Sequence, residues 1–496
     1  MRACEGARPL VEKQKELKMA EVQAGAGKKE FLKAVIVLVI AFSGWFIPAP
    51  APMTEIGMRC VTVFLSMIVG WSLTGRAWPS LMGMLLFPAT GVMTLKQFVA
   101  AGWGTDTFLF LVVAFVLVGY LKETGVSQFL ANWLLGRKFL EGHPWRLIAM
   151  ILFATYLICS LVNTFVGMLL MWEVVYGITH GIGQKPHDKF PSIMVFGIAM
   201  QGAFSLSAMP WGGNAIANLG VYANIMGAPA DMIQYVLFMV PFGILEIMVY
   251  IALTKFIFRL DVTPLKEYKL DVSGQGELAH ELKTALIMLA VFVVLLLAPS
   301  FIPKGSELAA FYNSFGSAGI ALLFFIVITL MYYKNKPVLN FADLATKNVP
   351  WNMLMMVAVI LAIGGCLINE KTGIAAFLSQ NVVPALTSVP SSMFLLIVIA
   401  VVVLLTNFLI NMVVVAMFLP VIIPICAGMG LSPELVSFGI MLASVNAILT
   451  PAGCAASSLL FPNKEWISAK EIYQYGVPTV LVNTVLIVVW CLMFPL

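Results

Sequence analysis

Long apolar stretches are the feature of this sequence that most constrains its fold. A helix needs about 20 apolar residues to cross the roughly 30 Å hydrocarbon core of a bilayer. Of the 496 residues, 61% are hydrophobic and only 11% are charged, which leaves too little polar surface for a soluble fold. The sequence therefore predicts an all-α polytopic membrane protein and excludes a soluble enzyme or a nucleic-acid-binding protein. We expect spanning helices at 34–51, 57–75, 78–94, 104–121, 233–258, 284–302, 314–333, 351–369 and 476–494.

Two further apolar regions, 145–178 and 392–426, are interrupted by polar residues. The first contains Cys-Ser-Leu-Val-Asn-Thr at 159–164, and the second contains Thr-Asn-Phe-Leu-Ile-Asn at 406–411. The interruption leaves arms of about 14 residues in the first region, or about 21 Å at 1.5 Å per residue. Because such arms are shorter than the hydrocarbon core, we expect both regions to be re-entrant hairpins that turn back at their polar tips.

Two other stretches, 192–226 and 435–461, are long enough to cross but contain helix breakers near their middles. The breaks are Ser-Ala-Met-Pro-Trp-Gly-Gly-Asn at 207–214 and Leu-Thr-Pro-Ala-Gly-Cys at 449–454. Unwound backbone is tolerated at membrane depth only where it lines a polar cavity or a packed interior. Two tips and two broken helices therefore predict one polar site near the membrane midplane.

The distribution of Lys and Arg predicts the orientation. With the N-terminus inside and both hairpins re-entrant, 25 of the 29 basic residues lie in inner loops, and only Arg59, Lys96, Lys304 and Lys371 lie outside. Basic residues concentrate on the cytoplasmic side of membrane proteins. We therefore expect about 11 transmembrane helices, a cytoplasmic N-terminus and an outer C-terminus. The short charged tail favours a bacterial inner membrane.

The unusual regions belong to an internal repeat with an offset of 248 residues. Trp103 corresponds to Trp351, and Asn163 at the first tip corresponds to Asn411 at the second. Five expected crossings separate the two tryptophans, and an odd number gives the two copies opposite orientations. Broken helices in inverted repeats are typical of secondary transporters, which bind substrate at the repeat interface.

Three segments carry a resemblance to a known family. Leu-Thr-Asn-Phe-Leu-Ile-Asn-Met-Val-Val-Val-Ala-Met-Phe-Leu-Pro at 405–420 is similar to the second hairpin of the divalent anion/sodium symporters, which are dicarboxylate and citrate carriers of the ion transporter superfamily. Residues 160–171 resemble their first tip, and 446–458 resemble their unwound helix. The resemblance covers the chain from about residue 34 onward. It implies an elevator-type transporter that forms a homodimer.

The resemblance also implies a set of site residues. In the family, tip Asn and Thr side chains hold the substrate carboxylates, and tip oxygens with unwound-helix carbonyls hold sodium. The expected substrate-binding residues are Asn163, Thr164, Asn411, Pro210, Gly212, Pro451 and Gly453. The expected cation-binding residues are Thr406, Asn163 and Asn411.

Several sodium ligands of the family are replaced in this chain. The tip Ser is Val162 in one copy and Ile410 in the other, and the position that corresponds to Thr406 is Ile158. Apolar side chains cannot coordinate Na⁺, so the pattern supports anion binding by the two Asn amides better than it supports Na⁺ coupling. Na⁺ nevertheless remains the favoured coupling ion, and no other cofactor or metal is expected.

Two acidic residues in apolar segments offer proton coupling as an alternative. Glu173 lies in the second arm of the first hairpin, and Glu246 lies near the middle of 233–258. An acid at membrane depth is costly and is a functional hypothesis by default. The structural alternatives are that Glu173 reaches water at the inner face and that Glu246 makes a polar contact between helices.

These patterns predict a secondary active transporter of small organic anions, above all dicarboxylates, and not an enzyme. The alternatives are a proton-coupled carrier, an exchanger of other oxyanions, and the membrane subunit of a binding-protein-dependent carrier. The expected partners are the substrate anion, the lipid bilayer and a second copy of the chain. The expected divisions are a cytoplasmic extension (1–33), scaffold helices (34–140), a first transport half (141–260), a cytoplasmic linker (261–283), further scaffold helices (284–390) and a second transport half (391–496).

Overall fold

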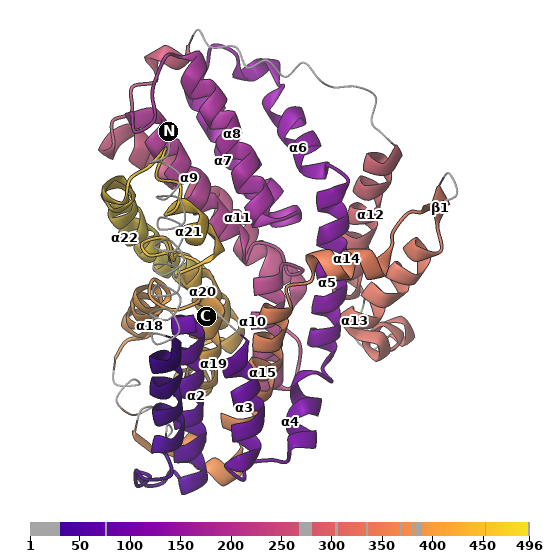
Figure 1. Cartoon of the computed structure of the whole chain (residues 1–496), viewed down its shortest axis with the longest axis vertical. Helices are drawn as coiled ribbons and strands as arrows, with labels where there is room; N and C mark the ends of the chain where they lie inside the picture. Colours follow the sequence, from indigo (N-terminus) through magenta and orange to yellow (C-terminus); the bar gives the residue numbers. More distant parts are fainter. Residues whose placement is uncertain are drawn as a thin grey trace, which may run out of the picture.

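The computed structural model shows an elongated helical protein (Figure 1). It describes residues 30–74, 77–266, 280–302, 306–333, 336–367, 369–377, 380–381, 384, 389–451 and 453–494. In these residues the only strands are β1 (Tyr332–Tyr333) and β2 (Lys336–Pro337), which form a short antiparallel hairpin. Almost all of the described chain is therefore helix, as the sequence predicts, and the 1–33 extension lies largely outside the described residues.

The described residues form a succession of helices. A first helix covers 30–43. The helices of the first half are α2 (Glu55–Thr74), α3 (Trp78–Ala89), α4 (Leu95–Gly102), α5 (Asp106–Glu123), α6 (Val126–Leu135), η1 (Lys138–Leu140), α7 (Pro144–Leu161), α8 (Thr164–Gly181), α9 (Lys189–Ser205), α10 (Gly213–Met226), α11 (Met232–Ala252), η2 (Leu253–Ile257) and η3 (Thr263–Leu265). The helices of the second half are α12 (His280–Leu297), η4 (Ala298–Phe301), α13 (Glu307–Thr329), α14 (Phe341–Asn348), α15 (Trp351–Leu367), η5 (Glu370–Thr372), α16 (Ile374–Phe377), α18 (Ser391–Thr406), α19 (Asn411–Met429), α20 (Pro433–Ser444), α21 (Ala455–Leu460) and α22 (Ala469–Met493).

Several described helices are long and apolar enough to cross a membrane. Four qualify by length and composition, and they are Pro144–Leu161, Met232–Ile257, Glu281–Ala298 and Ala469–Met493. The number rises to six if two bent pairs are each counted as one span, namely α4 with α5, bent by 46°, and α14 with α15, bent by 84°. The total of about 11 crossings stays a prediction, since other expected spans, such as α3, are shorter apolar helices.

The arms around the first tip are longer than the sequence analysis expects. Helices α7 and α8 have 18 residues each, because helix continues into the polar segment up to Leu161 and resumes at Thr164. Each arm is therefore about 27 Å long, and α7 alone meets the length criterion for a span. The argument that 14-residue arms are too short to cross is corrected by this finding, so the re-entrant path of the hairpin rests on its polar tip alone.

The backbone shows the internal repeat in matching elements. A short helix precedes a long one at Trp103, between α4 and α5, and again at Trp351, where α14 precedes α15. The long helices then end near glycines 248 residues apart that share a left-handed conformation, with φ of 76° at Gly125 and 64° at Gly373. Only glycine adopts this conformation without strain, which explains why both copies use it.

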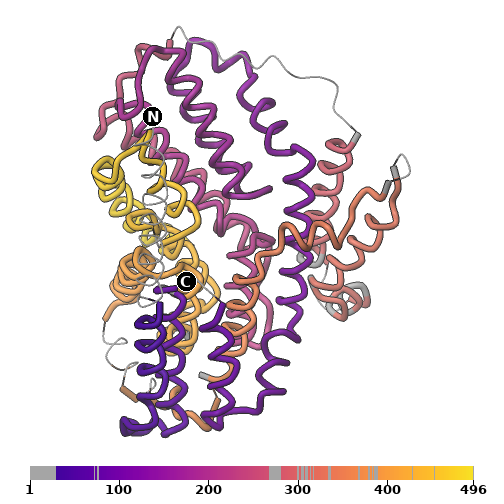
Figure 2. The backbone as a smooth tube through the Cα atoms, viewed as in Figure 1, coloured from indigo at the N-terminus to yellow at the C-terminus, as the bar shows by residue number. Residues whose placement is uncertain are grey.

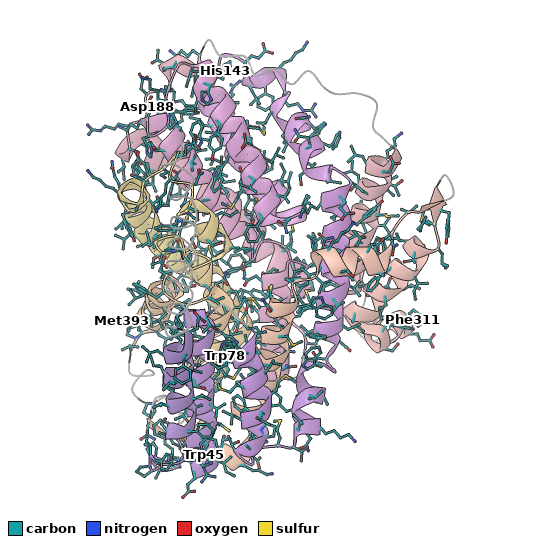
Figure 3. The ribbon with its side chains drawn as sticks, in the orientation of Figure 1. Trp45, Trp78, His143, Asp188, Phe311 and Met393 are labelled. Atoms are coloured by element: carbon teal, nitrogen blue, oxygen red, sulfur yellow. The ribbon has the colours of Figure 1, made fainter. Side chains whose placement is uncertain are left out.

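The packing joins the two halves of the chain. Helices α7 and α8 pack on α9, and α18 and α19 pack on α20, so each tip lies beside the first part of its own broken helix. Helix α21 packs on both α8 and α9, which places yellow C-terminal segments against magenta ones (Figure 2). Helix α10 contacts α5 and α15, which lie in the regions that the sequence analysis expects to be scaffold. His143 and Asp188 lie at one end of the molecule and Trp45 at the other (Figure 3).

Candidate functional site

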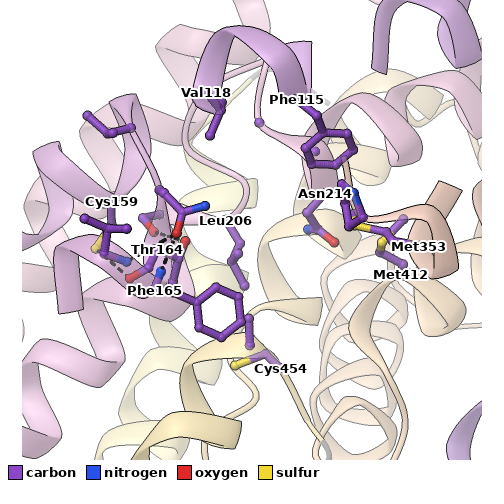
Figure 4. A pocket seen from close by; sticks show the side chains of 18 of the residues that line it. Phe115, Val118, Cys159, Thr164, Phe165, Leu206, Asn214, Met353, Met412 and Cys454 are labelled. Carbon is purple, nitrogen blue, oxygen red and sulfur yellow. Dashed lines mark hydrogen bonds between the residues drawn. The ribbon is translucent and has the colours of Figure 1, made fainter. Parts of the chain in front are cut away.

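A cavity of about 710 Å³ lies where the two tips and the two helix breaks meet. Residues of the tips and breaks form one part of its lining, and residues of α5, α14 and α15 form the other. In Figure 4, Cys159, Thr164 and Phe165 lie across the cavity from Asn214, Met353 and Met412. The structure thus brings together six of the seven residues that the sequence analysis assigns to substrate binding: Asn163, Thr164, Asn411, Gly212, Pro451 and Gly453.

Asn163 forms the N-cap of α8. Its Oδ1 accepts hydrogen bonds from the backbone N–H groups of Phe165 (3.0 Å) and Val166 (3.2 Å), which satisfies donors that a helix start would otherwise leave free. The cap fixes the orientation of the amide, since only its oxygen can accept. Its Nδ2 donates to no protein group among the described residues, so this NH₂ group is available to an anion in the cavity.

Asn411 has a similar arrangement at the second tip. It is the first residue of α19 and is 6% exposed. Its Oδ1 accepts from the N–H of Met412 at 2.8 Å, and its Nδ2 has no protein acceptor in the described part of the chain. The two tips therefore present amide donors, together with the N-termini of two long helices, to the same cavity. Helix N-termini favour anions because of their free N–H groups and the helix dipole.

Thr164 connects the first tip to the first broken helix. Its hydroxyl lies 3.3 Å from Oγ of Ser205 at the end of α9, and Ser205 also lines the cavity. Within the break, Nδ2 of Asn214 donates to Oγ of Ser207 at 2.9 Å. These bonds tie tip, break and α10 together. Sequence reasoning missed Ser205 and Asn214 because small polar residues are common near helix ends.

Pro210 lies apart from the other predicted substrate residues. It lines a separate small cavity of about 70 Å³ beside Phe110 and Leu296. Its neighbour Trp211 lines the large cavity instead, with its Nε1 buried and without a partner among the described residues. The helix break turns Pro210 away from the site while presenting Trp211, an arrangement that the spacing of the motif alone does not reveal.

Two lysines line the cavity and were not predicted as site residues. Lys122 lies in the last turn of α5 and Lys347 in the last turn of α14. No Asp or Glu is among the described residues that line the cavity. The nearest ion pair joins Lys347 Nζ to Glu123 Oε1 at 4.0 Å, with both side chains well exposed. The sequence analysis counted these lysines only as inner-loop charges, although their position directly beside a span was a usable signal.

The predicted cation residues do not form one cluster. Thr406 is fully buried, and its hydroxyl donates to the carbonyl of Ser444 at 2.6 Å rather than facing the cavity. Beside it, Asn407 Nδ2 donates to the carbonyl of Asn446 at 3.2 Å, and its Oδ1 accepts from the N–H of Leu449 at 2.8 Å. Backbone groups that the break leaves without helical partners are thus satisfied by protein side chains.

Glu246 lies in a fully buried polar cluster away from the cavity lining. Its carboxylate accepts hydrogen bonds from Nε2 of Gln201 on α9 and from Nδ2 of Asn483 on α22, the latter at 3.3 Å. The oxygens of the same two side-chain amides, Gln201 Oε1 and Asn483 Oδ1, are buried and have no partner among the described residues. Glu246 thus makes the polar contact between helices that the sequence analysis offers as the structural alternative, and its role in coupling stays a prediction.

Glu173 differs from Glu246 in its surroundings. Its side chain is exposed on α8, and it is absent from the cavity lining. This position agrees with the reading in which Glu173 reaches solvent. Among the described residues, no group of three His, Cys, Asp or Glu side chains could hold a metal ion.

Together, the apolar helices, the paired tips and the polar cavity define a multi-pass membrane transporter. The chain belongs to the citrate transporter family, whose model matches residues 64–443. The resemblance to citrate and dicarboxylate carriers is thereby confirmed, and the protein is a transporter rather than an enzyme.

Three further comparisons agree. An uncharacterized transporter of Methanocaldococcus jannaschii is 20% identical over 481 residues, which cover 95% of each chain. The fold is similar to that of the YdaH transporter of Alcanivorax borkumensis, with a TM-score of 0.56, 18% identity, and coverage of 79% of this chain and 86% of that one. It is also similar to Neisseria gonorrhoeae MtrF, which represents a class of antimetabolite efflux pumps, with a TM-score of 0.56, 13% identity, and coverage of 93% and 94%.

Proposed function

We propose that this protein is a secondary active transporter of small organic anions that carry two or more carboxylates. The observation that carries the proposal is the composition of the large cavity, in which two lysines and two available Asn amides face the same space and no acidic side chain lies among the described lining residues. Such a site attracts anions and disfavours cations. The family description extends the candidate substrates from dicarboxylates such as succinate to the tricarboxylate citrate.

The lining suggests how the substrate is held. Asn163 and Asn411 donate from the two tips, and the starts of α8 and α19 add helix-dipole attraction. Lys122 and Lys347 approach from the scaffold side and balance a further carboxylate. Met353, Met356 and Phe115 form an apolar wall that suits the carbon backbone of such an acid.

We further propose an elevator mechanism. The cavity lies between the tips and breaks of 141–260 and 391–496 and the scaffold helices α5, α14 and α15. The hydrogen bond between Thr164 and Ser205 joins the first tip to the first broken helix, which supports movement of the tips and breaks together as one unit. Movement of that unit past the scaffold would carry the two Asn residues and leave the two lysines behind.

We propose cation coupling, with two candidate ions. The sequence analysis favours Na⁺ at Thr406, but the carbonyl oxygens of Ser444 and Asn446 beside it already accept hydrogen bonds from Thr406 and Asn407. The cluster at Glu246 gives more support to H⁺. A protonated Glu246 could donate to Gln201 Oε1 after rotation of that amide, which would satisfy one of the buried oxygens that now lacks a partner. Exchange of internal for external anion and a role as the membrane subunit of a binding-protein-dependent carrier remain the alternatives.

The proposed assembly is a homodimer in the inner membrane, with its N-terminus in the cytoplasm and its C-terminus outside. Uptake of labelled succinate and citrate into proteoliposomes tests the function. We expect accumulation under an imposed pH gradient. Accumulation under a Na⁺ gradient alone would transfer the coupling role to Thr406, and uptake only against internal anion would identify an exchanger. The absence of uptake and counterflow of both acids would refute the proposed substrate class.

A further inference from the structure

A second groove, of about 640 Å³, lies apart from the transport cavity and shares no lining residue with it. Its basic residues are Lys189, at the start of α9, and Arg259, which follows η2. Gln474 and Tyr475 of α22 contribute polar groups, and Phe256 and Ile257 contribute apolar ones. The groove therefore joins helices from both halves of the chain and is basic on one part and apolar on another.

The local backbone explains how charged and apolar residues come together here. Helix α11 continues into a π-helix over Leu253–Ile257, and Arg259 then adopts a positive φ of 51°, which is uncommon for a non-glycine residue. This turn leaves Phe256 68% exposed and Ile257 59% exposed beside the arginine. Single-turn π-helices often occur at functional sites.

The two cations of the groove lack acidic partners. Lys189 Nζ donates to the backbone carbonyl of Arg259 at 3.1 Å, and in the described part of the chain no carboxylate oxygen lies within 4.0 Å of either basic group. The neighbouring acids accept hydrogen bonds from other groups. Asp188 accepts from the N–H of Lys185 at 2.7 Å, and Glu471 accepts from Ser192 at 2.9 Å.

Two further charged groups of opposite sign, Asp261 and Lys255, lie near the groove. Asp261 is exposed and accepts from the N–H of Thr263 at 2.9 Å. Lys255 adds a third cation, with its Nζ 5.4 Å from the ring centroid of Phe256. The groove thus places two cations that have no carboxylate within 4.0 Å, among the described residues, directly beside exposed apolar side chains.

We infer that this groove binds the headgroup of an anionic phospholipid. Lys189 and Arg259 are both among the basic residues that the positive-inside pattern places at the inner face, where anionic lipids attract such side chains. In this arrangement the phosphate lies between Lys189 and Arg259, Gln474 and Tyr475 contact the polar headgroup, and the acyl chains run along Phe256 and Ile257. The phosphate of a bound lipid would give the two cations the close anionic partner that they lack, and the lipid would bridge α9, α11 and α22.

The exposed apolar residues distinguish a lipid from a soluble anion. A free phosphate or organic acid would pair with the two cations but has no apolar chain to contact Phe256 and Ile257. A phospholipid uses both parts of the groove. The site also differs from the transport cavity, whose lining contains none of these residues.

The test is lipid retention by the purified full-length protein. Protein extracted from vesicles of equal parts phosphatidylglycerol and phosphatidylcholine is examined by native mass spectrometry. We expect the wild type to retain phosphatidylglycerol preferentially. A basic side chain near an anionic membrane surface contributes about fivefold in affinity, so Lys189→Gln combined with Arg259→Gln should weaken this preference about 25-fold. Lys185→Gln, which changes a nearby inner-loop lysine outside the groove lining, should retain it.

Two further measurements can each overturn the inference. If the double variant does not fold, the wild type alone still tests the proposal, because equal retention of the two lipids would overturn it. Soluble glycerol phosphate is added as a competitor, and displacement of phosphatidylglycerol at equal concentration would show a free-anion site and also overturn it. Asn163→Ser should bind lipid like the wild type, so that failure of the transport proposal and failure of this inference can be told apart.

Discussion

Asn163 and Asn411, 248 residues apart, line the same cavity and use their side-chain oxygens in the same way. Each oxygen accepts a hydrogen bond from the first turn of the helix at its tip, and each NH₂ group has no protein acceptor among the described residues. The oxygen fixes the side chain, and the nitrogen is available to a ligand. Two positions related by the repeat thus supply two matched donors for a molecule with at least two acceptor groups.

The charge of the cavity should determine how strongly substrates of different charge bind. Lys122→Gln and Lys347→Gln each remove one positive charge from a lining without described acidic residues. We expect KM for citrate to rise about tenfold, which corresponds to about 1.4 kcal/mol, and KM for succinate to rise less. Lys138→Gln, outside the cavity lining, is the control. An equal KM in variant and wild type would show that neither lysine contacts the anion.

Substrate should protect two cysteines from thiol reagents. Cys159 and Cys454 line the cavity, whereas Cys426 is buried outside the lining. In a Cys4→Ser background, we expect succinate or citrate to slow the modification of Cys159 and Cys454 by a small methanethiosulfonate, as measured by mass spectrometry. Unchanged labelling at saturating substrate would place the binding site elsewhere.

Coupling through Glu246 predicts a separation of two activities. Glu246→Gln keeps the shape of the side chain but cannot release a proton. Its oxygen can accept from one of the two neighbouring amides, and its NH₂ group can donate to the oxygen of the other after that amide rotates. Accumulation driven by a pH gradient should be lost, while exchange of external for internal anion should persist. Glu173→Gln, at an exposed position, should leave both activities intact. Persistent pH-driven accumulation by Glu246→Gln would exclude this residue from coupling.

Thr406 makes a structural contact that stability measurements can detect. Thr406→Val removes the donor to the buried carbonyl of Ser444, and an unsatisfied buried acceptor costs about 1–3 kcal/mol. We expect a lower midpoint of thermal unfolding and an unchanged KM for the anion. A variant of wild-type stability that needs more Na⁺ for uptake would instead support sodium binding at this residue.

The sequence predicts the positions of the tips and breaks better than the details around them. Polar residues within apolar segments are visible in one dimension, so Asn163, Asn411 and Gly453 could be assigned to one site from the repeat. The length of the first hairpin's arms could not be predicted in this way, because the helices continue into the polar segment and have 18 residues each in place of 14.

Other site residues depend on three-dimensional packing. Lys122 and Lys347 reach the cavity only because α5 and α14 pack beside it, and no periodicity encodes that contact. Pro210 points to another cavity because the broken segment turns between neighbouring residues. The partners of Glu246 come from α9 and α22, far away in the sequence. The sequence therefore indicates the chemistry of each residue but not which residues lie next to it in the fold.

The central claim is that the anion is held between the two tips, and conservative tip variants test it most directly. Asn163→Ser keeps an oxygen that can cap α8, at a cost of at most a few tenths of a kcal/mol. Asn411→Ser keeps a side-chain oxygen in the first turn of α19. Both variants lack the NH₂ donor. Asn132→Ser on α6 is the matched control. Uptake of labelled succinate and citrate should fall at least about tenfold in each tip variant and stay at the wild-type level in the control. Wild-type uptake by both tip variants in folded, reconstituted protein would contradict the account.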